Sequence, residues 1–436
     1  MKSIYKNKQI FSWMLNDWAN SAFATTVMAG FFPIFFKSYW SSADLVNVST
    51  AKLAFANSFA GILIAVTAPF LGAIADRSGA KRKFLLFFTL LGGLSCICMS
   101  FIAAGRWQSA VFFYVLASIG FFSSTIFYDS MLTDVTDSEK DFDNVSSGGY
   151  ALGYLGGGIL FAVNVWWTLQ PSLFCFSGKA AAVKGSFMSA GIWWIIFSLP
   201  LFITSRKNSK MNAAIHSSAG NDIKSAFQQI RQTLHEIRHL KVIFTFLVAY
   251  WLYIDGVDTI IRMAIDYGLS IGFSQVDLIT ALLMIQFLAF PFTYITGMLA
   301  TKTGTRQMIY FSIAIYIIIC IWAAFLSHKW EFFAIAFLIS MVQGATQALS
   351  RSYFASLIPA EKSAEYFGFY NMLGKFAVIL GPILMGITNL FAGYLIHDAA
   401  MSARIGMLSV VLLFISGAFM LSRVDEKAGR LEKKFL

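Results

Sequence analysis

Ionisable side chains stand inside segments of the chain that are otherwise long and apolar, and these are the residues that could do chemistry. A charge at the centre of a bilayer costs at least about 2.5 kcal/mol on insertion scales, so each one kept there is a candidate functional residue. The candidates for a substrate or proton pathway are Asp17, Asn20, Asp129, Asp255, Asp258, Arg262, Arg351 and Lys375.

Asp17 and Asp255 are the leading candidates for proton coupling, because a carboxyl group buried in an apolar medium can take up and release a proton as its surroundings change. Asp255, Asp258 and Arg262 step by three and four residues, which places them on one helical face and spaces the last two to pair. Lys375 could bind a substrate carboxylate, pair with Asp255 or serve as a packed structural charge. For every member of this set, the alternative is a static ion pair that holds helices together.

The composition excludes a soluble globular protein. Of the 436 residues, 58% are hydrophobic and only 13% are charged, whereas a water-soluble domain carries about 25% charged residues. The chain is therefore predicted to be an integral membrane protein. No cluster of basic and aromatic residues suits nucleic acid, so the net charge of +11 is assigned to loops at the membrane surface.

Twelve segments approach the roughly 20 apolar residues that a membrane-spanning helix needs. They are residues 12–36, 52–75, 83–105, 108–133, 147–169, 186–204, 242–267, 276–300, 306–327, 331–356, 366–392 and 403–423. Of the 33 Lys and Arg residues, seven fall on the side opposite the termini, two within spans and the other 24 on the side of the termini. The positive-inside rule therefore predicts that both termini are cytoplasmic.

A short basic loop occurs twice, between spans 2 and 3 and between spans 8 and 9. The first copy reads Gly72-Ala-Ile-Ala-Asp76-Arg77-Ser-Gly79-Ala-Lys81-Arg82-Lys83, and the degraded second copy reads Gly297-Met-Leu-Ala-Thr301-Lys302-Thr-Gly304-Thr-Arg306. Gly72 would let two helices approach, Gly79 would supply a backbone angle that other residues rarely adopt, and the cations suit an anionic leaflet. The repeat predicts two related halves of six helices.

The acidic residue is the feature that a plain basic turn, serving only to set topology, would not need. With Asp76 the loop resembles the signature between helices 2 and 3 of the major facilitator superfamily, where the acid helps to latch the two halves together. The resemblance implies these gating residues: Gly72, Asp76, Arg77, Gly79, Arg82, Gly297 and Gly304. Because Thr301 replaces the acid in the second copy, we expect a weaker latch there.

Further stretches resemble one branch of that superfamily, the autophagy-related vacuolar amino-acid effluxers and their bacterial relatives. The matching runs are Asp17-Trp18-Ala19-Asn20-Ser21-Ala22-Phe23, Tyr253-Ile-Asp255-Gly256-Val-Asp258-Thr259, Gln343-Gly344-Ala-Thr-Gln347-Ala-Leu-Ser350-Arg351-Ser352, Glu365-Tyr-Phe-Gly368-Phe-Tyr370 and Gly374-Lys375-Phe-Ala377. The resemblance implies transport of amino acids or similar small solutes. The chain departs from the family pattern at Asp258, where an uncharged polar residue is expected.

Between the halves, residues 205–241 form a polar linker that ends in a predicted amphipathic helix. Within it, His235, Glu236 and His239 match the H-E-x-x-H pattern of zinc proteases. A catalytic zinc needs a third protein ligand and a cleft, and the sequence offers neither. A membrane-bound zinc metalloprotease is therefore the minor alternative, and no metal or other cofactor is expected.

Together these features predict an all-α integral membrane protein with 12 transmembrane helices in two pseudo-symmetric six-helix bundles, the major facilitator fold. The bundles are residues 1–204 and 242–436, the latter with a cytoplasmic tail. The predicted function is secondary transport of a small solute by alternating access, with protons or another ion as the coupling partner. Cytoplasmic closure is assigned to a pair between Asp129 and Arg351.

The alternative on the same fold is a non-transporting membrane sensor or scaffold. Neither reading makes the protein an enzyme. The compact chain with short loops favours a bacterial inner membrane over a eukaryotic vacuole.

Overall fold

The computed structural model describes residues 7–136, 138–204, 240–270, 274–376, 380–425 and 428–429. Twelve helices in this part of the chain are long and apolar enough to cross a membrane, which confirms the predicted number of spans. They are Lys8–Trp40, Ala51–Ser78, Lys81–Met99, Trp107–Val135, Glu139–Leu169, Lys179–Thr204, Lys241–Ile261, Asp277–Thr303, Thr305–Ala324, Lys329–Leu357, Ala360–Ile396 and Arg404–Ser422. The predicted linker helix with His235, Glu236 and His239 lies outside the described residues.

The chain forms two compact units, each built from separate stretches of sequence. The first comprises Met1–Val135, Leu152–Lys224 and Ala364–Gly368, and the second comprises Thr136–Ala151, Ser225–Ser363 and Phe369–Leu436. A short piece from each half of the sequence thus packs with the unit formed mainly by the other half. The predicted division into residues 1–204, 205–241 and 242–436 stays a prediction.

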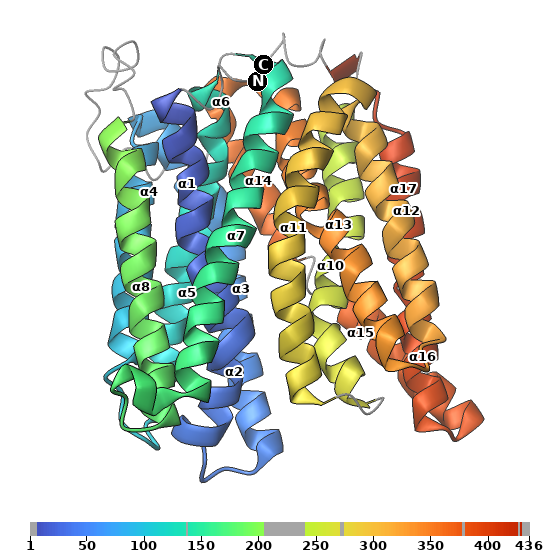
Figure 1. The fold of residues 1–436 in the computed structure, drawn as a ribbon. Coiled ribbons are helices and arrows are strands. Elements are labelled where there is room, and N and C mark those ends of the chain that lie inside the picture. The colour runs from blue at the N-terminus through green and yellow to red at the C-terminus, as the bar shows by residue number, and fades with distance from the viewer. Residues whose placement is uncertain are drawn as a thin grey trace. The chain divides into compact units, whose positions relative to one another are not determined.

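The regular elements of the first unit, within its described residues, are all helices joined by short loops. Its elements are α1 (Lys8–Ala22), η1 (Phe23–Phe31), α2 (Phe32–Phe35), η2 (Phe36–Trp40), α3 (Val46–Ser78), α4 (Lys81–Met99), α5 (Trp107–Ser130), α6 (Leu132–Val135), most of α7 (Phe142–Leu169), η4 (Pro171–Phe174) and α8 (Lys179–Thr204). Helix α4 packs against α5 and α8, α1 against α8, and α3 against α5. These helices lie side by side in Figure 1, where they run from blue to green.

The described regular elements of the second unit are also all helices. Its elements are η3 (Glu139–Asp141), the start of α7, α10 (Lys241–Ser270), α11 (Gln275–Thr303), α12 (Thr305–Ala324), α13 (Lys329–Leu357), η5 (Ala360–Lys362), most of α14 (Ser363–Phe376), α15 (Leu380–Ile396), α16 (Ala399–Ser409) and α17 (Val411–Ser422). Helix α11 packs against α13, α10 against α17, α12 against α13, and α15 against α16.

The first span is not a uniform α-helix. Its stretches η1 and η2 have the wider π-helical turn, and they flank the short helix α2, which begins with Phe32 and Pro33. Proline has no N–H to donate, and its ring clashes with the carbonyl four residues earlier, so the helix changes its hydrogen-bond register around it. The polar side chains of Asn20 and Thr25, both nearly buried, lie next to and within this altered stretch.

The glycine-rich part of α7 packs closely against α1. A Cβ atom at Gly153 would lie 2.7 Å from Oγ of Ser21, and one at Gly156 would lie 2.6 Å from the indole of Trp18. Any larger side chain would force the two helices apart. These glycines therefore serve helix packing, which small residues make possible within membranes.

Side chains that point away from the packed helices are large and apolar. Phe55, Ile203 and Leu390 are 76%, 79% and 77% exposed. Such exposure is expected of residues that face lipid in a spanning helix, and it would be costly in water.

On the side opposite the termini, the loop between the first two spans is held by an ion pair. Lys52 Nζ lies 2.6 Å from Oδ2 of Asp44 and 3.8 Å from the centre of the Trp107 ring. The Lys52 and Ser41 side chains donate hydrogen bonds to Asp44 and lower the pKa of its carboxyl group.

Gly120 provides a test of the packing between α4 and α5. A Cβ at this position would lie 2.5 Å from the backbone nitrogen of Gly92 and 2.7 Å from the carbonyl of Phe88. Because backbone atoms cannot move aside, Gly120→Ala should destabilise the protein by about 1–3 kcal/mol. Thermal unfolding in detergent would show this as a lower midpoint.

The matched control is Gly61→Ala in α3, where nothing lies within 4 Å of the added Cβ. Alanine favours a helix more than glycine does, so this variant should match or exceed the parent midpoint. Equal midpoints for both variants would contradict the close approach of α4 and α5.

Candidate functional site

Asp17 is nearly buried in α1, and a tyrosine of α5 holds it. The hydroxyl of Tyr128 donates to Oδ2 of Asp17 at 2.8 Å. The ring of Trp13 stacks on that of Tyr128 with centroids 4.4 Å apart, and its indole N–H donates to the Tyr128 carbonyl at 2.9 Å. A candidate proton carrier is thus oriented by a neutral group that can donate or accept a hydrogen bond.

Asp255 is completely buried in α10 and binds the start of α15. Its Oδ1 accepts a hydrogen bond from the backbone N–H of Gly381 at 2.8 Å, and its Oδ2 accepts one from Leu380 at 3.1 Å. Thr259, one turn further along α10, donates to Oδ1 at 3.4 Å. The carboxylate therefore satisfies backbone donors that have no partner within α15.

Further predicted pathway residues are spread over four described helices, α1, α5, α10 and α14. Asn20 is 6% exposed in α1, and Asp129 is 3% exposed near the end of α5. Asp258 is half-buried in α10, and Lys375 is half-buried in the last turn of α14. The side chain of Arg262 lies outside the described part of the chain, so its pairing with Asp258 stays a prediction.

Asp76 in the first loop copy binds the start of a helix 288 residues away. Its Oδ1 accepts from the backbone N–H of Ala364 at 3.2 Å, and its Oδ2 accepts from that of Glu365 at 2.7 Å. A Cβ at Gly72 would contact the carbonyl of Ala364 and lie 2.9 Å from Cα of Glu365. Gly72 thus gives the close approach that was predicted, and it brings Asp76 to the N-terminal amides of α14.

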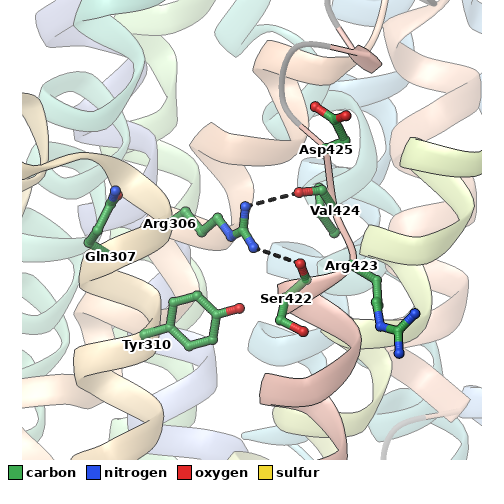
Figure 2. Close-up of a pocket in the computed structure, with 7 residues that line it drawn as sticks. All are labelled: Arg306, Gln307, Tyr310, Ser422, Arg423, Val424 and Asp425. Carbon is green, nitrogen blue, oxygen red and sulfur yellow. Dashed lines mark hydrogen bonds between the residues drawn. The ribbon is translucent and has the colours of Figure 1, made fainter.

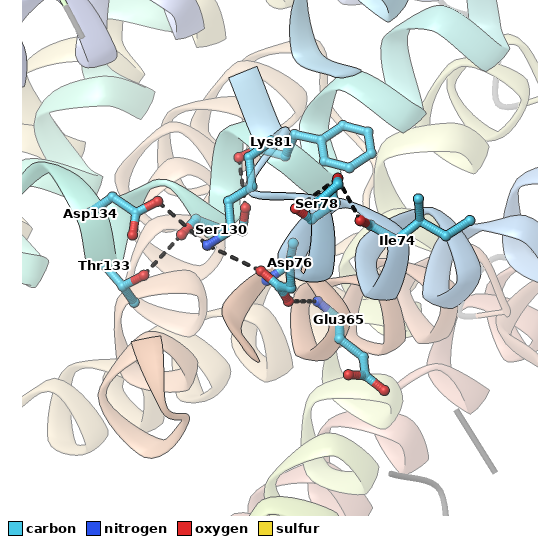
Figure 3. A network of polar contacts seen from close by, with 11 residues as sticks. Ile74, Asp76, Ser78, Lys81, Ser130, Thr133, Asp134 and Glu365 are labelled. Carbon is cyan, nitrogen blue, oxygen red and sulfur yellow. Dashed lines mark hydrogen bonds and ion pairs between the residues drawn. The ribbon is translucent and has the colours of Figure 1, made fainter. Parts of the chain in front are cut away.

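Lys81 completes this contact, whereas the predicted gating residue was the neighbouring Arg82. Its ammonium group lies 3.2 Å from Oδ1 of Asp76 and 3.4 Å from Oδ2 of Asp134. The Lys81 and Asp76 side chains are only 10% and 3% exposed. Figure 3 shows the amine between the two carboxylates. Gly79 makes the turn possible, with a left-handed φ of 58° at the end of α3.

The second loop copy uses a different acidic residue. Asp143, in the first turn of α7, accepts a hydrogen bond from the hydroxyl of Thr305 at 2.7 Å and another from Ser352 of α13. Thr301 occupies the position of the acid in the first copy, but it donates to the carbonyl of Met298 in its own helix. In the first copy the carboxylate belongs to the loop, and in the second it belongs to the helix that the loop contacts.

Close packing accompanies this second contact as well. A Cβ at Gly297 would contact the side chain of Ser147 and lie 3.2 Å from the carbonyl of Asp143. Gly304, which directly precedes Thr305, has a φ of 103°, a conformation that favours glycine. Gly297 is therefore favoured by the close approach of α7, and Gly304 by its own backbone conformation.

Arg351 is almost completely buried and binds α7 next to Asp143. Its Nε donates to the hydroxyl of Ser146 at 2.8 Å, and one terminal nitrogen donates to the Ser146 carbonyl at 2.9 Å. The guanidinium also stacks over the ring of Tyr150 at 4.3 Å. Asp129 belongs to the other compact unit, so the predicted pair of Asp129 with Arg351 stays a prediction.

Comparison with known proteins decides the family. A family model described as "Vacuole effluxer Atg22 like" matches residues 46–143 and 133–434. The chain belongs to this Atg22-like family. It is similar to the uncharacterized MFS-type transporter YxiO of Bacillus subtilis (strain 168), with 36% identity over 423 residues that cover 96% of this chain and 95% of the relative.

A fungal relative and two solved structures agree with this. Autophagy-related protein 22 of Eremothecium gossypii is 21% identical over 99% of this chain and 93% of its own length. The proton:xylose symporter XylE has a TM-score of 0.70 at 13% identity, with 98% of each chain covered. FucP in the outward conformation has a TM-score of 0.65 at 14% identity, with 95% of this chain and 99% of FucP covered. These likenesses confirm the major facilitator fold.

As a member of the Atg22-like family, the protein is a multi-pass membrane transporter, which implies transport and not enzymatic chemistry. The resemblance read from the loop signature and the matching runs is confirmed.

Several contact residues of this Atg22-like transporter were missed by sequence reasoning. They are Lys81, Asp134, Asp143, Ser146, Thr305, Ser352, Tyr128 and Thr259. For Asp143 a signal existed, since it is acidic, lies just before the glycine-rich stretch of α7 and belongs to a helix that the repeat relates to α14. For the hydroxyl groups no signal existed, because serine and threonine are frequent in membrane helices without such a role.

Replacing Asp143 tests how α7 is held against α11. In Asp143→Asn the amide is a weaker acceptor for the Ser352 and Thr305 hydroxyls, so the start of α7 should separate more often from Gly297. A cysteine placed at the buried Ser147 reports this separation. In a protein otherwise free of cysteine, its alkylation rate should rise about five-fold, as expected for a capping contact of about 1 kcal/mol.

The control is Asp141→Asn, which makes the same chemical change two residues earlier, at the half-buried end of η3. Its alkylation rate should equal that of the parent. If Asp143→Asn labels no faster than Asp141→Asn, Asp143 does not hold this contact.

Proposed function

We propose that the protein exports amino acids or a related small metabolite from the cytoplasm and couples this movement to protons. The observation that carries the proposal is Asp255, a carboxylate without solvent exposure in the middle of a spanning helix. Retaining such a group within a membrane is costly unless it has a function. Asp255 accepts hydrogen bonds from two backbone amides of α15. A change in its protonation would therefore change how firmly α15 is held.

The charges of half-buried side chains support the proposed substrate class. An amino acid carries an ammonium and a carboxylate, so its pathway needs groups of both signs. Asp258 and Lys375 supply them, on α10 and α14. The word "effluxer" in the description of the matching family favours outward movement, and the proton:xylose symporter of the same fold shows that this architecture can serve proton coupling.

Alternating access is assigned to the two loop contacts. Asp76 binds the first turn of α14, and Thr305 binds Asp143 in the first turn of α7. In the predicted repeats, each contact joins a loop of one half to a helix of the other. Both would have to break when the side of the termini opens, and the Asp129–Arg351 pair would break with them.

The location is proposed from loop charge. Most Lys and Arg residues lie on the side of the termini, which the positive-inside rule makes cytoplasmic. The 36% identical relative from Bacillus subtilis supports a bacterial plasma membrane.

Asp255→Asn in liposomes tests the coupling. Asparagine can still accept one hydrogen bond from the start of α15, but it cannot carry a proton. We expect accumulation driven by an imposed proton gradient to be lost, whereas exchange of labelled for unlabelled amino acid at equal pH should stay within about three-fold of the parent. Exchange does not require the carrier to return without substrate. It therefore does not depend on the step in which the carrier would move a proton.

The control is Asp277→Asn, on the side of the membrane opposite the termini. It removes a carboxylate whose Oδ1 lies 2.5 Å from Nζ of Lys329. It should leave both assays unchanged. Loss of exchange together with accumulation in Asp255→Asn would assign Asp255 to structure, and absence of any amino-acid flux in the folded parent would refute the substrate class.

A further inference from the structure

A basic pocket lies where α12 begins and α17 ends, away from the residues discussed so far. It measures about 580 Å³ and is lined by Arg306, Gln307, Tyr310, Ser422, Arg423, Val424 and Asp425. Figure 2 shows these side chains around the pocket, with Arg306 reaching across from α12 to the last residues of α17. The volume falls within the range of sites that hold small ligands or headgroups.

Arg306 builds the pocket and gives it charge. Its two terminal nitrogens donate to the carbonyls of Val424 at 2.9 Å and Ser422 at 3.0 Å, which joins the start of α12 to the end of α17. Tyr310 adds a hydrogen bond from its hydroxyl to the Ala418 carbonyl at 3.3 Å. The guanidinium charge therefore stays fixed at the wall of the pocket.

Arg423 supplies a second cation that is exposed. Its guanidinium lies 4.9 Å from the centre of the Phe419 ring. Asp425 also lines the pocket, but its Oδ1 accepts a hydrogen bond from the backbone N–H of Ala428 at 3.2 Å. The lining of the pocket thus holds two guanidinium groups and one engaged carboxylate, and this balance favours an anion with several acceptor oxygens.

The helix surfaces that continue from the pocket into the membrane are apolar and exposed. Phe311 lies four residues after Gln307, on the same face of α12, and is 46% exposed. On α17, Ile415 and Phe419 are 52% and 53% exposed. A ligand with an anionic head and apolar tails would match both parts of this surface.

We propose that this pocket binds the phosphodiester headgroup of a phospholipid in the leaflet on the side of the termini. The phosphate oxygens contact Arg423 and the fixed charge of Arg306, the headgroup contacts Gln307, and the acyl chains lie along Phe311 and Phe419. Such a lipid would join α12 to α17. Basic pockets between spanning helices have this chemistry.

Native mass spectrometry of the full-length protein in detergent tests the site with three probes. Phosphatidylglycerol carries phosphate and tails, diacylglycerol carries only the tails, and glycerol 3-phosphate carries only the phosphate. We expect retention of phosphatidylglycerol alone. Arg423→Gln should weaken its binding about five-fold, the effect of one cation at a lipid surface, and Arg423→Lys should restore most of it. Arg306 stays in place because it holds α17.

The matched control is Lys302→Gln, which removes an exposed cation from the last turn of α11, outside the pocket. It should leave binding unchanged. Equal binding of diacylglycerol, or an unchanged affinity in Arg423→Gln, would overturn the site. Displacement of the lipid by an equal concentration of glycerol 3-phosphate would show a soluble-phosphate site and would overturn the assignment to lipid.

Discussion

A carboxylate within a membrane protein persists only where N–H and O–H groups point at it. Among the described residues, Asp76, Asp255 and Asp143 each meet that condition with two donors from other helices, and Asp17 meets it with the hydroxyl of Tyr128. Asp76 takes two amides at the start of α14, Asp255 takes two at the start of α15, and Asp143 takes two hydroxyl groups. Helix starts carry free amides and partial positive charge, so a carboxylate fixes where one helix begins against another.

Both loop copies contact a helix start, but the acidic group and the donor groups lie on opposite partners in the two copies. In the first, the loop supplies the acid and the helix supplies backbone donors. In the second, the loop supplies the hydroxyl of Thr305 and the helix supplies the acid, Asp143. The weaker latch expected from Thr301 stays a prediction, because the second contact has an acid of its own in Asp143. A contact between two segments can survive the loss of one partner if the other segment provides the same kind of group.

Twelve spans could be predicted because hydropathy is a local property of about 20 residues. Gly79 and Gly304 could also be predicted, since a tight turn between helices needs positive φ. The partners of Asp143 could not, because they lie 162 and 209 residues away and serine and threonine give no signal. A charge within an apolar segment made Asp255 a candidate pathway residue, but only the structure showed that its backbone donors lie 125 and 126 residues further along.

The position of Asp255 makes two demands on one side chain. As a carboxylate it accepts from the backbone of Leu380 and Gly381, which holds α15 against α10, and also from Thr259 of its own helix. As a carboxylic acid it would have one oxygen that carries a proton and is a weaker acceptor, so the contacts at that oxygen would weaken. A group that carried a proton would therefore also loosen the helix beside it. Proton transfer and helix movement would then share the same hydrogen bonds, and no separate relay would be needed to connect them.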